Sequence, residues 1–240
     1  MKTLIVIPVR MASKRFPNKP MALIKGKPMI QRVWEKAVLS SVGDVIVACS
    51  EKEVYDLITS LKGKAELTDP DLPSGTDRVY AAIQKHSNIS QYSSIINLQG
   101  DMPLIETEVI QKVNIPLEQG YDIGTIVTSF KDNSEIQDKN ITKVHIEWIK
   151  KNLIGRALDF SKDVDFLKGK NYYHHVGIYS FRYQVLKKFV SLPPSENEKI
   201  RQLEQMRALD ANISIGVGYI KNVPISIDTK EDLIRMEKSI

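Results

Sequence analysis

The stretch Leu4-Ile5-Val6-Ile7-Pro8-Val9 is a run of six apolar residues that stops at Arg10. A short apolar run that ends in a polar turn is typical of a strand buried on both faces of a sheet. Outward from it, similar runs alternate with amphipathic stretches. Strands are expected at 4–9, 44–48 and 94–98, and helices at 28–39, 51–61, 74–85 and 106–117. This alternation predicts right-handed βαβ units and a parallel sheet covered by helices on both faces.

The second half of the chain has a different pattern, with longer alternating stretches after residue 121. Strands are expected at 123–130, 142–149, 153–158, 174–181 and near 213–217, and helices at 183–190, 195–209 and from 231 onward. Ser74 with Asp77 and Ser195 with Glu198 mark two helix starts, because a hydroxyl and an acid three residues on satisfy free backbone amides. We expect one α/β domain over residues 1–240, with halves at 1–120 and 121–240.

The composition is that of a folded soluble domain, with 240 residues, 42% of them hydrophobic and 26% charged. It excludes collagen-like, low-complexity and disordered chains. Cys49 is the single cysteine, and its apolar neighbours favour a small buried hydrophobe over a catalytic thiol. The N-terminal apolar run is too short for a signal peptide, and no stretch approaches the ~18 apolar residues of a membrane span. A reducing cytoplasm is therefore the expected location, with no membrane partner.

Basic residues gather in one short segment after the first apolar run, although the formal net charge of the whole chain is only +5. They are Arg10, Lys14, Arg15, Lys19, Lys25 and Lys27. The segment has a single aromatic residue, Phe16, and not the series of interleaved aromatic residues that stack on bases, and no recognition motif accompanies it. A nucleic-acid partner is therefore not expected, whereas an anionic ligand is.

The loop from Pro8 to Pro20 carries the clearest ligand-binding signal, because ligands of open parallel sheets bind at the carboxyl ends of the strands. It contains no glycine, so it is neither a dinucleotide-binding glycine loop nor a P-loop. Its basic side chains and the hydroxyl of Ser13 are suited to clamp a triphosphate through guanidinium forks and an ammonium group. A solvated basic turn is the plainer alternative.

Two aspartates follow apolar stretches. Asp101 comes after Gln99-Gly100, and Asp228 ends Ile225-Ser226-Ile227, which is expected to be a strand just before the last helix. A carboxylate that faces a triphosphate usually acts through a divalent cation, and Mg²⁺ prefers one or two carboxylates together with phosphate oxygens. The pair is therefore predicted to bind Mg²⁺, and a turn or helix cap is the alternative for each taken singly.

Seven motifs occur in register along the whole chain. They are Pro8-x-Arg10-x-x-Ser13-x-Arg15-x-Pro17-x-Lys19-Pro20, Gly26-Lys27-Pro28-Met29-Ile30, Ser74-Gly75-Thr76-Asp77-Arg78, Asn97-x-Gln99-Gly100-Asp101-x-Pro103, His175-x-Gly177-Ile178-Tyr179, Leu203-Glu204-Gln205-Met206-Arg207 and Asp228-Thr229-x-x-Asp232-Leu233. In this order they resemble the 3-deoxy-manno-octulosonate cytidylyltransferases, or CMP-Kdo synthetases. The resemblance implies a three-layer nucleotidyltransferase fold with a mostly parallel, twisted central sheet and a smaller excursion in the second half.

The resemblance also implies a reaction. The 2-hydroxyl of the acid sugar Kdo would attack the α-phosphate of CTP, with Mg²⁺ as cofactor, to give pyrophosphate and CMP-Kdo for lipopolysaccharide biosynthesis. The implied catalytic residues are Lys19, Arg10 and Asp101, and Asp101 and Asp228 would ligate the metal. The implied nucleotide contacts are Val9, Arg10, Ala12, Ser13, Lys19, Ser74, Arg78 and Gln99. The implied sugar contacts are Arg15, Arg78, Gln99, His175, Tyr179, Glu204 and Gln205.

Some residues leave alternatives open on the sugar side. His175 and Tyr179 are four apart in a strand pattern and therefore face the same side. A structural histidine is the alternative for His175, and a solvated helix face is the alternative for Glu204 and Gln205. The chain also departs from the family pattern. Met102 replaces a glutamate, Pro73 replaces a histidine, and residues 161–165 replace a Ser-Arg-x-x-Ile-Pro segment.

Two other functions compete with this one. A modified Kdo such as its 8-amino form is a second acceptor to consider, because the departures lie on the sugar side. A nucleotide-binding module without turnover is the other, although such a module has no need of the two aspartates. The family is commonly homodimeric, and an apolar face from Phe160, Phe166, Tyr172 and Tyr173 is the expected interface.

Overall fold

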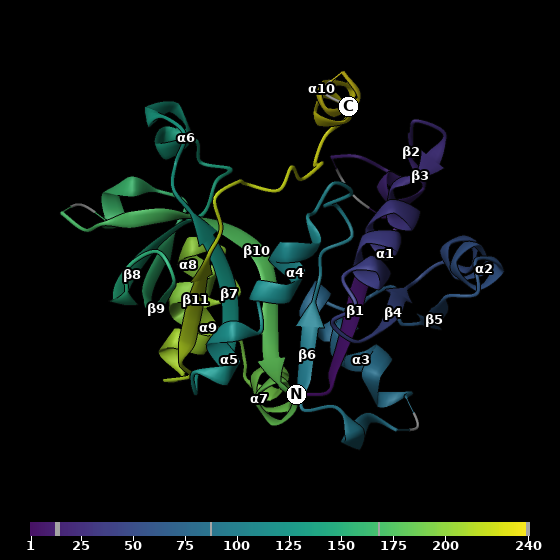
Figure 1. Ribbon diagram of the computed structural model, residues 1–240, viewed down its shortest axis with the longest axis horizontal. Helices are drawn as coiled ribbons and strands as arrows, with labels where there is room; N and C mark the ends of the chain where they lie inside the picture. The colour runs from purple at the N-terminus through teal and green to yellow at the C-terminus, as the bar shows by residue number, and fades with distance from the viewer. Residues whose placement is uncertain (13–14, 87, 168, 239–240) are drawn as a thin grey trace. The chain divides into compact units, whose positions relative to one another are not determined.

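The computed structural model describes residues 1–12, 15–86, 88–167 and 169–238 (Figure 1). The chain forms two compact units. The first contains Met1–Gln111 and the segment from Pro224 onward, and the second contains Lys112–Val223. The sequence pattern groups the C-terminal segment with the second half, whereas its contacts assign it to the first unit.

The first unit is built on a parallel sheet in the order β5-β4-β1-β6. β1 (Thr3–Val9) lies inside it and is buried at all seven positions, which confirms the strand expected from the first apolar run. Leu4 pairs with Asp44 of β4 on one side and with Ile95 of β6 on the other. The other strands of this sheet are β4 (Asp44–Cys49) and β6 (Ser94–Asn97), on the two sides of β1, and β5 (Lys64–Leu67), which pairs with β4 at the edge. Of the four strands in this sheet, β5, a short edge strand, was not expected from the sequence.

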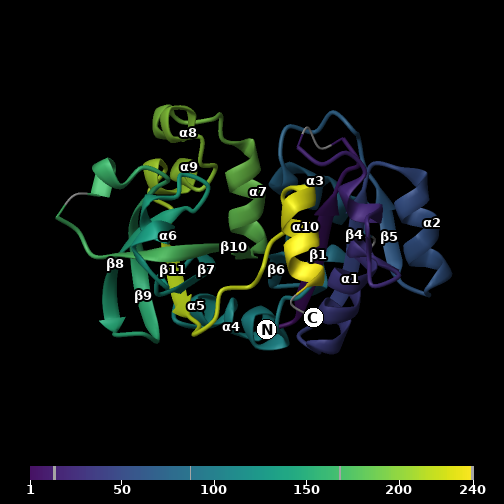
Figure 2. The same ribbon diagram turned by 90° about the horizontal axis from the view of Figure 1, so that it is seen from above.

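Helices lie on both faces of this sheet. The chain runs from β1 through α1 (Met29–Leu39) to β4, and from β4 through α2 (Lys52–Ser60) to β5. It then returns through α3 (Gly75–Gln84) to β6. Because right-handed connections that run in opposite directions lie on opposite faces, α1 and α3 are on opposite sides of the sheet, as Figure 2 shows. The short elements of this unit are η1 (Lys19–Met21), β2 (Leu23–Ile24), β3 (Lys27–Pro28), η2 (Ile89–Gln91) and α10 (Lys230–Glu237).

Two local predictions about single residues are confirmed. Ser74 caps α3, since its Oγ accepts from the amide of Asp77, and Ser195 caps its helix in a capping box with Glu198. Cys49 is fully buried, and burial raises the pKa of its thiol to about 12. It is therefore a packing residue, because the reactive thiolate is absent at neutral pH.

The second unit contains a mixed sheet. Its order is β10-β7-β11-β9-β8, and β10 also pairs with β8, so that the strands form a closed circuit. Among the described strand pairs of this unit, β11 with β7 is the one parallel pair. The strands are β7 (Ile123–Thr128), β8 (Lys143–Lys150), β9 (Ile154–Ser161), β10 (Tyr172–Arg182) and β11 (Ile215–Tyr219). The expected parallel arrangement therefore describes the sheet of the first unit only.

Three expected elements differ from the structure. The helix expected at 106–117 is divided into α4 (Thr107–Lys112) and α5 (Ile115–Glu118), since Pro116 has no amide proton to continue the hydrogen-bond ladder. The helix expected at 195–209 is divided into α8 (Glu196–Arg201) and α9 (Met206–Asp210) at Gln202, whose φ of 52° is left-handed. The segment before Asp228 is not a strand. Ile227 instead makes one backbone bond to the carbonyl of Asp101.

The remaining helices of the second unit are short, apart from α7. They are α6 (Asn133–Gln137), η3 (Val164–Leu167) and α7 (Tyr183–Ser191). Within the described ranges, no helix combines the length and the apolar character needed to cross a membrane.

Candidate active site

A cavity of about 510 Å³ opens in the first unit where β1 and β6 end. Every described residue that the sequence predicted to contact nucleotide lines it, and so do Arg15, Asp101 and Asp228. The remaining predicted contact, Ser13, lies outside the described residues. The cavity therefore lies where the rule that ligands bind at the carboxyl ends of parallel strands predicts it.

Lys19 joins the two predicted metal ligands on the floor of this cavity. Its Nζ donates to Asp101 Oδ2 at 2.9 Å, to Asp228 Oδ1 at 3.2 Å and to the carbonyl oxygen of Ile227 at 2.9 Å. The Lys19 side chain is 15% exposed, compared with 25% for Asp101 and 41% for Asp228. The cluster is thus partly shielded from water, which strengthens its electrostatic interactions relative to a surface pair.

The loop that carries Lys19 is fixed by apolar packing. Phe16 is buried in a core cluster with Ile24, Met29 and Ile227. The amide of Asn18 donates to the carbonyl of Met11 at 3.0 Å and closes the loop. Asn18 has a left-handed φ of 59°, which turns the chain into η1. Lys19 therefore points into the cavity because Phe16 anchors the loop beside it.

Glu51 also supports this loop, and the sequence analysis did not identify it. Its Oε1 accepts from the amide of Met11 at 3.1 Å and from Ser50 Oγ at 2.8 Å. Its Oε2 is buried and has no hydrogen-bond partner among the described residues. A carboxylate just after β4 was the available signal, but only the fold brings it to a loop 40 residues earlier.

We expect Glu51→Ala to weaken CTP binding about fivefold, since the loop loses an acceptor worth about 1 kcal/mol. Glu51→Gln is the matched control. It keeps a side-chain oxygen for the Met11 amide and is expected to bind within about twofold of the original protein. Isothermal titration with CTP measures both. Equal losses in the two variants would show that the charge of Glu51, not its bond to Met11, supports the loop.

Gly100 allows the end of β6 to approach the end of β1. A Cβ atom at this position would lie 2.3 Å from Val9 Cγ1 and 3.3 Å from the carbonyl oxygen of Pro8, so any larger residue would force the Val9 side chain to move. Gln99, beside it, donates to Asn97 Oδ1 at 2.9 Å. The close approach brings Asp101 to the same cavity as the basic loop.

Ser74 and Arg78 form another side of the cavity. Ser74 uses its hydroxyl to hold Asp77, with Oγ donating to Oδ2 at 2.7 Å. Arg78 is buried, and its guanidinium donates to Thr68 Oγ1 and to the carbonyls of Asp69 and Pro70. Burial lowers the pKa of Arg78 from its ordinary value. This geometry favours a positioning role for Arg78, and a direct contact with a sugar carboxylate stays a prediction.

The donor set suits a divalent cation. Asp101 and Asp228 present carboxylate oxygens to one point, where the ammonium group of Lys19 binds both of them. No group of three or more His, Cys, Asp or Glu side chains able to hold a metal occurs within the described ranges. Two carboxylates without a closed cage match the preference of Mg²⁺, which keeps positions for water and phosphate oxygens.

The predicted sugar contacts His175 and Tyr179 lie in the second unit. Their rings are 5.4 Å apart, so both face the same side, as their spacing predicts. His175 is buried, and its Nε2 lies 2.9 Å from Thr125 Oγ1. The hydroxyl of Thr125 donates to the carbonyl of Ile178 at 2.8 Å, so Nε2 carries the proton of a neutral ring. Thr125 is a second residue that sequence reasoning missed.

Burial makes the stability of the protein sensitive to acid at His175. It lowers the ring's pKa to about 3 from an ordinary 6.5. Above pH 6.5 the ring is neutral in the folded and the unfolded chain and adds no pH dependence. As the pH falls from 6.5 toward 3, only the unfolded chain gains this proton. The free energy of unfolding therefore falls by up to about 1.4 kcal/mol per pH unit.

Urea unfolding at pH 7 and at pH 5 tests this effect with His175→Gln. We expect the variant to lose less stability between the two pH values than the original protein does. His174, whose pKa burial also lowers, contributes equally to both proteins and cancels in the comparison. Equal losses in the two proteins would mean that His175 does not stay neutral in the folded chain.

The helix-borne sugar candidates have different environments. Gln205 is buried, so a solvated face is wrong for this residue, whereas Glu204 is 32% exposed and lies 4.0 Å from Arg207. Burial, and secondarily the charge of Glu204, raises the pKa of Tyr179. Glu204 and Tyr179 therefore influence one another electrostatically, although they come from different elements.

One residue of the expected dimer face is misassigned. Phe160 is fully buried, with its ring 5.2 Å from that of His175. It therefore belongs to the interior of the second unit and cannot lie on an outer face. Phe166 is 49% exposed, and Tyr172 and Tyr173 are half-buried.

Comparison with known proteins shows to which family the chain belongs. The model of the cytidylyltransferase family matches residues 4–215. A 3-deoxy-manno-octulosonate cytidylyltransferase of Paramagnetospirillum magneticum is 41% identical over 97% of this chain and 95% of its own length. The solved structure of a CMP:2-keto-3-deoxy-manno-octonic acid synthetase complexed with CTP is 31% identical, with a TM-score of 0.87 over 100% of this chain and 98% of that one. UDP-glucose pyrophosphorylase, 14% identical with a TM-score of 0.71 over 100% of this chain and 98% of its own, shares the fold.

A parallel sheet with a glycine-free basic loop after β1 and Asp101 after β6, and with the carboxylate of Asp228 in the same cavity, has the fold and site of a nucleotidyltransferase. Within that class, the chain belongs to the cytidylyltransferase family, and its relatives are 3-deoxy-manno-octulosonate cytidylyltransferases. The resemblance indicated by the seven motifs is thereby confirmed.

Proposed function

We propose that the protein is a 3-deoxy-manno-octulosonate cytidylyltransferase, which activates Kdo with CTP and releases pyrophosphate. The observation that carries this proposal is the cavity where Lys19 meets Asp101 and Asp228 beneath the basic loop. Family membership supplies the base and the sugar, because the relatives at 37–41% identity carry this name.

The reaction balances without a redox partner. The 2-hydroxyl oxygen of Kdo forms a bond to the α-phosphorus of CTP, and the bond from that phosphorus to the bridging oxygen of pyrophosphate breaks. The hydroxyl proton leaves to solvent. Such transfers depend mainly on positioning and on neutralisation of charge. Arg10 and Lys19 are proposed to hold the triphosphate, and Lys19 offsets charge on the departing pyrophosphate.

Asp101 and Asp228 are proposed to hold Mg²⁺. When bound, the metal supplies positive charge that neutralises phosphate oxygens and lowers the pKa of the attacking hydroxyl. The roles of the protein are to fix the two carboxylates through Lys19 and Ile227 and to keep the basic loop in place through Phe16 and Glu51. Main-chain groups near Val9, Ala12 and the turn at residues 74–78 are proposed to bind cytosine.

His175 and Tyr179, with Glu204 and Gln205, are proposed to bind the sugar. We expect His175→Ala to raise the KM for Kdo about tenfold and to change the KM for CTP less than about twofold, because one buried polar contact is lost. His174→Ala is the matched control, since neighbouring strand residues point to opposite faces. Steady-state pyrophosphate release gives the KM for Kdo and the KM for CTP of both variants. Equal changes for both substrates would show that His175 is structural.

Other properties are proposed from family membership. They are use of the product in lipopolysaccharide biosynthesis, a cytoplasmic location, the three-layer fold for the complete chain, and a homodimer. Phe166 and Ile149, which is 71% exposed in the second unit, are apolar side chains suited to such an interface. Light scattering that gives a monomer at micromolar concentration would exclude the dimer. Failure of the product to enter lipopolysaccharide in a cell extract would exclude the biosynthetic role.

The acceptor is tested by pyrophosphate release from CTP and Mg²⁺ with Kdo, 8-amino-Kdo, sialic acid or no sugar, and with ATP, GTP and UTP as nucleotide controls. Release with CTP and Kdo supports the proposal. Release with 8-amino-Kdo alone would favour the modified acceptor. This acceptor is included because residues 161–165 depart from the family pattern on the sugar side. Silence with every sugar despite CTP binding would favour a module without turnover.

A further inference from the structure

Lys19 has no hydrogen-bonding capacity left for a ligand in this arrangement. An ammonium group carries three protons. Its three acceptors here are Asp101 Oδ2 at 2.9 Å, the carbonyl oxygen of Ile227 at 2.9 Å and Asp228 Oδ1 at 3.2 Å. A lysine that is to donate to a triphosphate must therefore first give up at least one of these protein partners.

We propose that Lys19 occupies the place of the divalent cation between Asp101 and Asp228, and that it exchanges these carboxylates for phosphate oxygens when metal and nucleotide bind together. This inference rests on the proposed function, since it assigns the order in which that site fills. It gives Lys19 two successive partners, the carboxylates first and the triphosphate afterwards.

The charges of the site support this exchange. Asp228 Oδ1 accepts from Lys19 at 3.2 Å and lies 3.2 Å from Arg15 Nη2, so two cations already share one oxygen. Two carboxylates thus face two cationic side chains, and their charges cancel. A free divalent cation would meet this neutral cluster and be repelled by the ammonium group at short range. A cation that arrives bound to a triphosphate is accompanied by the negative charge of the phosphates. That charge attracts Lys19 and Arg15 away from the carboxylates.

The location of Lys19 suits such an exchange. It lies at the first position of η1, next to Pro20, and the loop before it is anchored by buried Phe16. The backbone is therefore fixed, while the four methylene groups of the side chain allow the ammonium group to move. An arginine here would be a poorer choice, because its planar fork does not fit into a site for a compact ion.

The test measures Mn²⁺ binding in the absence of nucleotide, by electron paramagnetic resonance of the free ion. We expect Lys19→Met to bind Mn²⁺ at least ~10-fold more tightly than the original protein, because the competing ammonium group is gone. Lys52→Met is the matched control. It removes the same charge from an exposed side chain of α2 that pairs with Asp56, and it is expected to stay within about twofold.

A double variant locates the effect. Adding Asp101→Asn to Lys19→Met is expected to abolish the gain in Mn²⁺ affinity. Thermal unfolding with and without Mn²⁺ gives an independent readout, since a cation that binds the folded chain more tightly raises its Tm more. Lys19→Gln repeats the experiment if the methionine variant does not fold.

Equal or weaker Mn²⁺ binding by the folded Lys19 variants would overturn the inference. So would an equal gain in Lys52→Met, because it would show a general effect of charge. No nucleotide, sugar or turnover enters this measurement. A negative result in the Mn²⁺ titration therefore counts against the inference alone. The proposed function fails by a different result, namely that the original protein releases no pyrophosphate.

Discussion

Asp101→Asn is expected to lower kcat at least ~100-fold and to leave the fold intact. Asparagine has the shape of aspartate and keeps the backbone carbonyl that accepts from the amide of Ile227, so the loop has no reason to move. It removes the charge that meets Lys19 at the floor of the cavity and that is proposed to bind Mg²⁺. Steady-state pyrophosphate release gives kcat, and thermal unfolding shows whether the fold persists.

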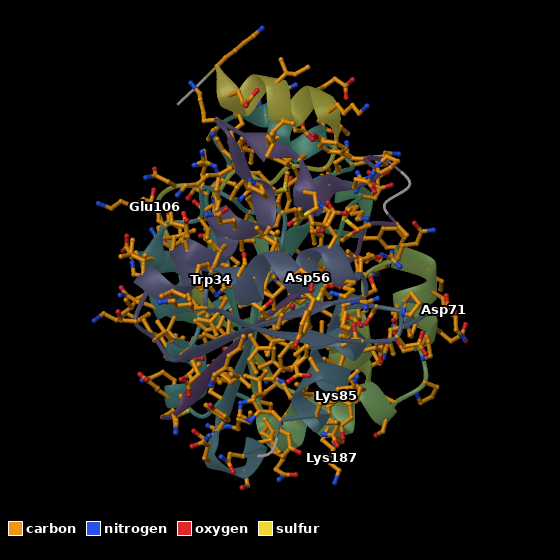
Figure 3. All side chains as sticks on the ribbon, turned by 90° about the vertical axis from the view of Figure 1, so that its right-hand side faces the viewer. Trp34, Asp56, Asp71, Lys85, Glu106 and Lys187 are labelled. Atoms are coloured by element: carbon orange, nitrogen blue, oxygen red, sulfur yellow. The ribbon has the colours of Figure 1, made fainter. Side chains whose placement is uncertain are left out.

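The matched control for this variant is Asp56→Asn. Asp56 is an exposed residue of α2 that pairs with Lys52, and it is labelled in Figure 3. Its replacement removes the same charge away from the cavity and is expected to leave kcat unchanged, because exposed ion pairs contribute little. Near-normal turnover of Asp101→Asn at saturating Mg²⁺ would reject the assigned metal role.

Lys19→Met is expected to lower kcat/KM for CTP by at least ~100-fold. A fixed ammonium group that meets the charge of the departing pyrophosphate stabilises the transition state more than the bound substrate, so kcat falls as well as affinity. Lys52→Met is again the control and is expected to keep its activity. Combined with the Mn²⁺ titration, the result separates two effects, since the same variant is expected to bind the free cation better and to turn over more slowly.

An unchanged kcat for Lys19→Met at saturating CTP would contradict this role. It would show that Lys19 contributes equally to substrate and transition state, so that only KM depends on it. The exchange of partners inferred for Lys19 would then concern binding order alone.

Much of the fold was predictable from local patterns. The run at residues 4–9 is apolar at every position because β1 has strands on both sides and helices over both faces. The errors occur where one residue decides the backbone. Gln202 is helix-compatible in type but adopts a left-handed φ of 52°, and Pro116 interrupts a pattern that is otherwise helical. The closing of the second sheet through β10 and β8 depends on pairing between distant strands, which no local pattern reveals.

The candidate site was predictable as a set of loops but not as a set of contacts. The rule that ligands bind at the carboxyl ends of parallel strands correctly predicted that the basic loop and Asp101 line one cavity. The contact from Lys19 to Asp228 spans 209 positions of sequence, and the contact from Met11 to Glu51 spans 40. Arg78 carries the charge that a ligand site needs, yet its guanidinium holds the loop at residues 68–70. Such partner choices depend on tertiary packing, so residue type and spacing alone did not determine them.

The most direct test of the central claim is ³¹P nuclear magnetic resonance of the original protein incubated with CTP, Kdo and Mg²⁺. We expect the three CTP resonances to be replaced by one phosphodiester resonance of CMP-Kdo and one pyrophosphate resonance, in equal molar amounts and only when Kdo is present. Persistence of CTP, or release of CMP and pyrophosphate without the sugar, would contradict the assignment of this chain as the enzyme that activates Kdo.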